Sequence, residues 1–159
     1  MVLGSQVEWA IHCCSVLSGI GSDERVSTKT LSEFHGIPKE YLSKALQQLA
    51  QAGLINGSLG PTGGYRLSKS PDEISFLDIV EAIEGRTNTF QCTEIRANNP
   101  CLKNEKVKGI CGVARIMFQA DEAWRQELRK TSLRDLQVIL KKNVSKELLE
   151  RSSEWLKGR

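Results

Sequence analysis

Three cysteines stand close together in the middle of the chain, in the segment QCTEIRANNPCLKNEKVKGIC. They are Cys92, Cys101 and Cys111, with eight and nine residues between them. An odd number of clustered thiols is more typical of a metal or redox site than of a disulfide scaffold. Thiolates bind soft or borderline metals, so zinc and iron–sulfur clusters are the candidates. Zinc sites favour closely spaced pairs such as Cys-x-x-Cys, which this segment lacks, so the spacing alone does not identify the metal.

The N-terminal segment adds two further side chains of metal-binding type. Glu8 and His12 are four residues apart and would share one face of a helix. A carboxylate and an imidazole at this spacing can both reach one metal, and the cysteine site is short of a fourth ligand. The alternative is a structural histidine beside a solvated charge. Cys13 and Cys14 are neighbours on the same helix and cannot face one ligand together, so we interpret them as small packing residues.

The spacing of apolar residues predicts the elements that position these groups. The pattern indicates a helix over residues 5–17, a second from Ser27 or Thr28 to His35, and a third from Pro38 to Gly53. Gly36 allows the left-handed turn between the last two, and Pro38 suits a helix start. Two short helices joined by a tight glycine turn, the second amphipathic, form a helix-turn-helix.

A β-hairpin is predicted directly after the helix-turn-helix. Leu54-Ile55 and Tyr65-Arg66-Leu67 read as strands on either side of the turn cluster SLGPTGG. A hairpin in this position is the wing of a winged helix. The segment ISFLDIVEAIEG then reads as a helix that Ser75 caps, with Asp78 at the capping-box position, and that ends at Gly85.

The rest of the chain reads as a loop followed by helices. Residues 86–111, which we call the cysteine arm, have little periodicity. A long helix is expected from Val113 to about Lys130, then a helix capped at Thr131 or Ser132, and finally KELLERSSEWLKG as a helix or a frayed tail. The predicted fold is mainly α with a small β-hairpin wing. Its parts are a winged helix-turn-helix (1–85), the cysteine loop (86–111), and a long helix with C-terminal helices (112–159).

The distribution of charge favours a nucleic-acid partner. Between Arg25 and Lys69 there are six basic and two acidic residues, whereas residues 70–100 carry six acidic and two basic ones. A basic face backed by an acidic one suits DNA, although a winged helix that binds proteins is the alternative. The recognition helix would read bases and the wing would approach the backbone. The candidate DNA-binding residues are Lys29, Lys39, Tyr41, Ser43, Lys44, Gln47, Gln48, Thr62, Gly63 and Arg66.

Other classes of protein are disfavoured. The sequence has no apolar run long enough to cross a membrane and no signal-peptide pattern, so we expect a cytoplasmic protein with reduced thiols. It also lacks a P-loop, a dinucleotide fingerprint and a nucleophile–base pair, so we expect no enzyme.

The order of these motifs resembles the Rrf2 family of bacterial transcriptional regulators, which includes IscR-like and NsrR-like members. The resemblance covers about residues 4–140 and is carried by GPTGGYRLSKSPDEISFLDIVEAIEG, the three-cysteine loop and the long helix. It implies a homodimer, joined through the long helix, that binds a double-stranded DNA operator as a repressor or activator. It also implies an iron–sulfur cluster on the cysteines, with a further ligand from the N-terminal helix, often that of the other subunit.

Within the family, VEWAIHCC and CTEIR are most similar to the redox-sensing RsrR branch. That resemblance implies a 2Fe–2S cluster held by Cys92 and Cys111 of one subunit and by Glu8 and His12 of the other. Trp9 would then relay the signal to the DNA-binding domain, or simply pack. Cys101 is the doubtful ligand, because it could complete a 4Fe–4S site as in nitric-oxide-sensing members. The pattern also fits a clusterless thiol-based regulator and, more remotely, a cluster carrier or electron-transfer protein.

Overall fold

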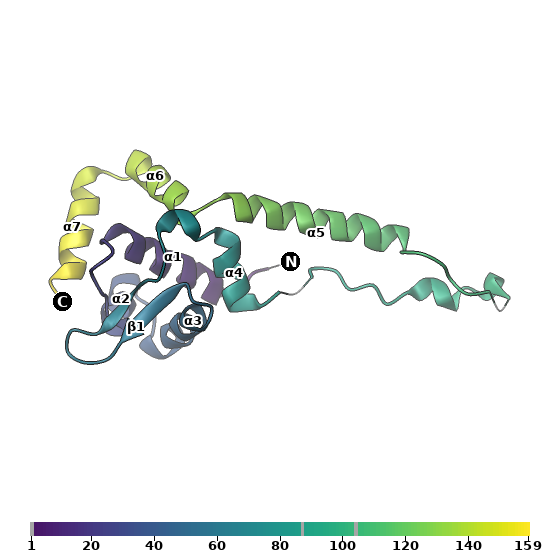
Figure 1. Ribbon diagram of the computed structural model, residues 1–159, viewed down its shortest axis with the longest axis horizontal. Coiled ribbons are helices and arrows are strands. Elements are labelled where there is room, and N and C mark those ends of the chain that lie inside the picture. Colours follow the sequence, from purple (N-terminus) through teal and green to yellow (C-terminus); the bar gives the residue numbers. More distant parts are fainter. Residues whose placement is uncertain (1, 87, 104) are drawn as a thin grey trace.

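The computed structural model describes residues 2–86, 88–103 and 105–159 and has the predicted fold, helical with one small hairpin (Figure 1). The helices are α1 (Ser5–Gly19), α2 (Thr28–His35), α3 (Lys39–Gln51), α4 (Phe76–Glu84), α5 (Gly112–Lys130), α6 (Leu133–Asn143) and α7 (Lys146–Lys157). The strands are β1 (Ile55–Ser58) and β2 (Gly64–Leu67). Short 3-10 turns occur at η1 (Pro71–Glu73), η2 (Ile95–Asn98) and η3 (Pro100–Leu102).

The N-terminal body consists of α1–α4 and the β-hairpin. Helix α1 lies at its centre, where it packs against α3 and α4, and it also packs against α6. Its buried face carries Val7, Ala10 and Leu17 together with Cys13 and Cys14, both of which are fully buried. Burial raises the pKa of the Cys13 thiol to about 12 and also raises that of Cys14, so neither is a thiolate at neutral pH. The interpretation of both cysteines as packing residues is therefore confirmed.

Local capping explains the helix-turn-helix. The Ser27 hydroxyl accepts a hydrogen bond from the Thr30 N–H at 3.0 Å, so Ser27 rather than Thr28 caps α2. Gly36 has φ +65° in the turn, where any other residue would be strained. Helix α3 begins at Lys39, one residue later than predicted, because Pro38 has an extended ψ of 132° and stands before the helix.

The wing is a two-stranded antiparallel hairpin in which Ile55 pairs with Leu67 and Ser58 with Gly64. Tyr65 on β2 also forms a bridge with Val26, which ties the hairpin to the segment before α2. Gly64 permits this contact, since its φ is +142° and a Cβ there would lie 2.6 Å from the Val26 carbonyl. The wing is thus held at a fixed angle to the helix-turn-helix.

Two helix starts have the same reciprocal capping box. Ser75 and Asp78 exchange side-chain and backbone hydrogen bonds at the start of α4, as predicted. Ser132 and Asp135 do the same at the start of α6. The two starts lie side by side, because the Leu133 N–H donates to the Ile74 carbonyl.

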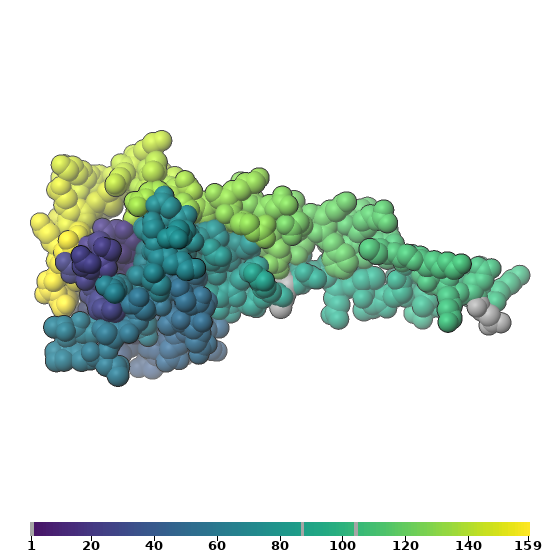
Figure 2. Space-filling model, in the orientation of Figure 1, coloured from purple at the N-terminus to yellow at the C-terminus, as the bar shows by residue number. Residues whose placement is uncertain are grey.

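Helix α5 and the cysteine arm form a narrow extension from the body (Figures 1 and 2). The chain leaves the body after α4, runs outward along the arm, and returns along α5 to the start of α6. Most side chains on α5 are exposed in one chain, and only Ala114 and Asp121 are buried. The extension thus presents apolar surface that one copy of the chain leaves uncovered.

The C-terminal segment is a docked helix rather than a frayed tail. Leu133 of α6 and Leu156 of α7 both join the core of the N-terminal body. The Trp155 ring lies 5.6 Å from that of Phe34 on α2, and Arg159 pairs with Glu33 over 2.6 Å. Helix α7 is therefore fastened to the first helix of the helix-turn-helix.

Candidate metal centre and nucleic-acid interface

Two contacts fix the start of the cysteine arm against α5. The backbone N–H of Thr89 donates to Asp121 Oδ1 over 3.3 Å, and the rings of Phe90 and Phe118 meet edge to face with centroids 6.0 Å apart. Asp121 is buried on a helix that is otherwise mostly exposed. Cys92 follows Phe90 by two residues, so these contacts hold it close to the N-terminal half of α5.

Cys111 lies directly before α5, at its N-cap position. Backbone hydrogen bonds from Ala114 and, to a smaller extent, Val113 lower the pKa of the Cys111 thiol below its usual value. The Arg96 guanidinium lowers it further, whereas partial burial and the Glu94 carboxylate act in the opposite direction. A thiol at the positive end of a helix is readily deprotonated, which metal ligation requires.

Arg96 connects the surroundings of the two cysteines. Its Nε and Nη2 donate to the Glu94 carboxylate over 2.5 and 2.8 Å, and Nη2 also donates to the Gly109 carbonyl over 2.9 Å. Hydrogen bonding to Glu94 raises the pKa of Arg96, and the negative charges of Glu94, Cys111 and Cys92 add to it. Both thiols therefore lie within electrostatic reach of one guanidinium.

Cys101 lies apart from this arrangement, on the short turn η3. Its side chain is exposed, and its backbone N–H donates to Asn99 Oδ1 over 2.9 Å. No group of three or more His, Cys, Asp or Glu residues that could hold a metal occurs within residues 2–86, 88–103 and 105–159. A role for Cys101 as a ligand stays a prediction.

Glu8 and His12 lie together on the exposed side of α1, as their spacing predicts. Both line a shallow cavity of about 290 Å³ together with Leu3, Val7 and Ile11. The cysteine pair and the Glu8–His12 pair belong to different elements, and the described part of one chain does not bring them into a single cluster. One chain thus carries two separate halves of a candidate site.

Aromatic rings extend from the α1 half-site into the helix-turn-helix. The Trp9 ring lies 6.4 Å from that of Tyr41 on α3, and the His12 ring lies 5.8 Å from that of His35 at the end of α2. Burial and, to a smaller extent, His12 lower the pKa of His35, whose Nε2 is buried without a hydrogen-bond partner among the described residues. Trp9, which stands between Glu8 and His12 in the sequence, and His12 itself thus lie against the two helices of the helix-turn-helix.

A groove lies between the wing and the N-terminal ends of α2 and α3. It has a volume of about 630 Å³, and Lys29, Lys39, Gly63 and Tyr65 contribute to its walls. Tyr41, Lys44 and Gln47 are exposed along α3, and Thr62 is exposed at the tip of the wing. The Ser43 hydroxyl is occupied, since it donates to the Lys39 carbonyl over 2.7 Å. Three of the predicted DNA-binding residues thus line the groove, and four more are exposed on α3 or on the wing.

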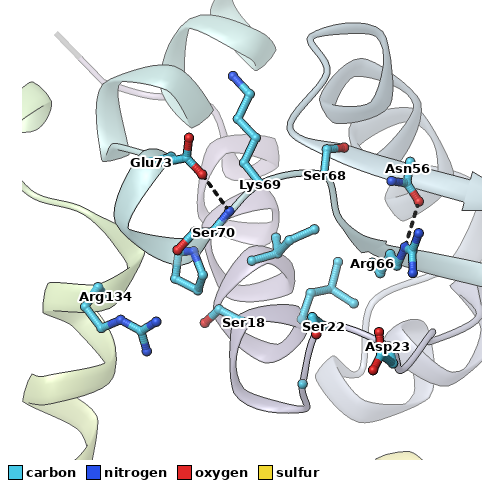
Figure 3. Close-up of a pocket in the computed structure, with 14 residues that line it drawn as sticks. Ser18, Ser22, Asp23, Asn56, Arg66, Ser68, Lys69, Ser70, Glu73 and Arg134 are labelled. Atoms are coloured by element: carbon cyan, nitrogen blue, oxygen red, sulfur yellow. Dashed lines mark hydrogen bonds between the residues drawn. The ribbon is translucent and has the colours of Figure 1, made fainter.

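Gln48 and Arg66 lie apart from that surface. Gln48 Nε2 donates to the Ile83 carbonyl at the end of α4 over 3.2 Å, so its side chain is directed into the protein. Successive side chains of a strand point to opposite faces, and Arg66 therefore lies opposite Tyr65. Arg66 lines a separate cavity of about 710 Å³ together with Ser18, Asp23 and Arg134 (Figure 3). We leave Gln48 and Arg66 out of the candidate interface.

Sequence patterns do not single out Arg96 or Asp121. Arg96 contributes only to the charge balance of its segment, although it follows Cys92 by four residues within CTEIR. Asp121 stands one residue after Ala120 on the predicted long helix. An acidic residue next to an apolar position is the one sequence signal that could have indicated a buried carboxylate there. Each also has a hydrogen-bond partner more than a dozen positions away, Gly109 for Arg96 and Thr89 for Asp121, and local patterns do not reveal such contacts.

Helix α5 presents an uncovered apolar stripe. Ile116 is 66% exposed and Val113 is 62% exposed, and Ile110 just before the helix is 64% exposed. Met117 is 37% exposed and Phe118 is 38% exposed. Apolar surface of this kind is typical of interaction sites. No helix in the described parts of the chain is both long and apolar enough to span a membrane.

Comparison with known proteins gives a consistent result. The model of the Rrf2 family, described as iron-dependent transcriptional regulators, matches residues 3–138. The chain is 33% identical over 116 residues to the protein Rrf2 of Nitratidesulfovibrio vulgaris, a match that covers 73% of each chain. It is 27% identical to the transcriptional regulator NsrR of Bacillus subtilis over 86% of this chain and 90% of that protein.

The fold has a counterpart among solved structures. The structure of IscR from T. potens superposes with a TM-score of 0.71 at 18% sequence identity. The superposition covers 91% of this chain and 92% of that one. At this identity the match concerns the fold alone.

Proposed function

The chain belongs to the Rrf2 family of transcriptional regulators, and we propose that an iron–sulfur cluster at a homodimer interface controls its affinity for operator DNA. Members of the family regulate transcription, so the chain is a DNA-binding regulator rather than an enzyme. The observation that supports the cluster proposal best is the pair of half-sites, with two thiols around one guanidinium and a carboxylate–imidazole pair on another element.

DNA binding is assigned to the wing groove and to the exposed side of α3. Lys29 and Lys39 would neutralise phosphates, because both border the groove at helix N-termini. Tyr41, Lys44 and Gln47 would reach base edges in the major groove. Gly63 keeps the turn of the wing tight, since a Cβ at that position would clash with the wing backbone, and it borders the groove in which a phosphate would lie.

The dimer is assigned to the apolar stripe of α5. Ile110, Val113 and Ile116 would pack against a second copy, because one chain leaves these apolar side chains exposed to solvent. In the other half-site, Leu3 and Ile11 line the cavity beside Glu8 and His12. Apolar side chains thus flank both halves of the candidate site, as expected for surfaces that become buried together.

Ligand chemistry supports a cluster shared between the two chains. Cys92 and Cys111 would supply thiolates from one subunit, and Glu8 and His12 would supply oxygen and nitrogen from its partner. Two thiolates with mixed oxygen and nitrogen ligation fit a 2Fe–2S cluster, whose potential depends on ligand type and net charge. When bound, the cluster would supply one-electron redox chemistry, as in the RsrR branch. A 4Fe–4S cluster with Cys101 as a third thiolate is the alternative.

Trp9 and His12 would carry the signal to the DNA-binding helices. Trp9 contacts Tyr41 on α3, and His12 contacts His35 on α2, so a shift of α1 changes the packing of both helices. Tyr41 is itself a candidate base-reading residue. A movement of α1, which carries Glu8 and His12, would therefore reach the DNA interface through one direct side-chain contact, that of Trp9 with Tyr41.

Anaerobic purification followed by iron and sulfide analysis tests the proposal. We expect a coloured protein with about two irons per cluster. Its affinity for its own upstream DNA in a gel shift should change when the cluster is reduced by dithionite. Four irons per cluster and loss of the cluster in Cys101→Ser would favour the 4Fe–4S alternative. A colourless protein without iron after reconstitution, which still binds DNA, would favour a thiol-based regulator.

A further inference from the structure

We propose that Arg96 is a positioning residue of the cluster site, where it holds Cys92 and Cys111 in one place and makes a bound cluster easier to reduce. The inference rests on the proposed iron–sulfur function. It concerns a residue outside the four ligands, and it assigns Arg96 a mechanical role and an electrostatic role that can be separated by mutation.

The mechanical role follows from the hydrogen bonds of Arg96. Its guanidinium binds Glu94, two residues after Cys92, and the Gly109 carbonyl, two residues before Cys111. It therefore joins the first half of the cysteine arm to its last residues, just before α5. The arm's backbone is shaped for this contact, since Glu94 has φ +53° and Gly109 has φ +70°. The planar guanidinium holds the Glu94 carboxylate with two donors and also reaches Gly109, a geometry that the point-like ammonium of lysine does not reproduce.

The electrostatic role follows from the charges that surround the site. Two thiolates and a Glu8 carboxylate would leave the ligand shell strongly negative. In the described parts of the chain, Arg96 is the cation that acts on both cysteines, and Glu94 opposes it at Cys111. Reduction adds one electron to the cluster irons and breaks no bond, so a nearby positive charge favours the reduced form and a nearby negative charge disfavours it.

Variants at Arg96 and Glu94 should shift the potential in opposite directions. In a titration of the purified holoprotein with dithionite and redox mediators, Arg96→Gln should lower the midpoint potential and Glu94→Gln should raise it. We expect a change of about tenfold in the equilibrium constant for reduction, or about 59 mV for one electron. Arg96→Lys keeps the positive charge and should therefore have a midpoint potential close to that of the wild type. Arg129→Gln, which removes an exposed arginine of α5, is the matched control.

A measurement without the cluster tests the clamp separately. In the apoprotein, hydrogen–deuterium exchange of peptides spanning residues 92–98 and 105–112 should speed up severalfold in both Arg96→Gln and Arg96→Lys, but not in Arg129→Gln. Unchanged exchange in the Arg96 variants would overturn the mechanical role. Potential shifts of the same sign in Arg96→Gln and Glu94→Gln would overturn the electrostatic role. A wild-type protein without iron would instead overturn the proposed function, and the exchange result would still decide the clamp.

Discussion

The attachment of α5 to the N-terminal body depends on one nearly buried ion network. Arg125 on α5 donates to Asp121 Oδ2 over 3.1 Å and to Glu81 Oε1 of α4 over 2.7 Å. The side chains of Arg125, Asp121 and Glu81 are 12%, 5% and 17% exposed. Asp121 also accepts the Thr89 N–H, so one carboxylate joins α5 both to the cysteine arm and, through Arg125, to α4.

Substitution of this network should destabilise the protein in a defined order. Arg125→Met removes the guanidinium that two nearly buried carboxylates share. Glu81 keeps its ion pair with Arg86 and Asp121 keeps the Thr89 N–H, so we expect the lower end of the cost of breaking a buried ion pair, about 3 kcal/mol. Asp121→Asn keeps one acceptor oxygen for the Thr89 N–H but puts an NH2 donor opposite the Arg125 Nε–H. It therefore loses the charge and one hydrogen bond, and we expect a cost of about 2 kcal/mol. Glu122→Gln is the exposed control on the next residue, with an expected change below about 0.5 kcal/mol.

Urea denaturation at one fixed protein concentration measures these differences, because a dimer's stability depends on concentration. Burial alone would raise the pKa of Asp121, but hydrogen bonds from Thr89 and Arg125 outweigh it and the pKa lies below the ordinary 3.8. Its charged form is thus favoured in the folded state. The stabilisation is complete above pH 3.8 and is lost as the pH falls through the folded pKa.

The wild type should therefore exceed Asp121→Asn in stability by a constant amount from about pH 6 to 8, and the difference should shrink only in strong acid. Equal stability of the two proteins at about pH 7 would refute the reasoning. So would a gap that closes between about pH 7 and 5, because Asp121 stays ionised throughout that range.

Three further predictions concern the DNA interface and its link to α1. Lys39→Gln should reduce the slope of log affinity against log salt by about 0.9 for each phosphate that is no longer neutralised, hence by about 2 in a dimer, whereas Lys130→Gln should leave it unchanged in the same binding titrations. Trp9→Ala should bind the cluster normally yet show a smaller difference in DNA affinity between its oxidised and reduced forms; an undiminished difference would argue against the relay. Gly64→Ala should destabilise the wing, because a Cβ would meet the Val26 backbone at 2.6 Å, and a melting temperature equal to that of the wild type would exclude the clash.

Local chemistry made much of the fold predictable from the sequence. Gly36 and Gly85 end helices and Ser75 starts one, because each satisfies backbone groups within a few residues. The pairing of Glu8 with His12 was predictable for the same reason, since helix geometry fixes which side chains share a face.

Contacts between distant segments were not predictable in the same way. Glutamine is a residue type that can read bases, but α4 packs against the side of α3 that carries Gln48, and the Gln48 amide donates to the Ile83 carbonyl. The amphipathic pattern of α7 did not show whether the helix packs on the rest of the protein, because that packing depends on contacts with Phe34 and Glu33 on α2. Arg96 bridges two parts of the cysteine arm that are thirteen residues apart, and no periodic pattern reports such a contact.

A mixed dimer tests most directly whether two chains share the cluster site. One chain would carry Cys92→Ser with Cys111→Ser, and the other Glu8→Ala with His12→Ala, each with a different affinity tag. A homodimer of either variant lacks two of the four ligands at both of its sites. The tandem-purified mixed dimer has one complete site, formed by the cysteines of one chain and by Glu8 and His12 of the other. We predict that the mixed dimer holds one cluster, against two in the wild-type dimer and none in either variant homodimer. A mixed dimer without iron, from variants that still dimerise, would contradict a site built across the interface.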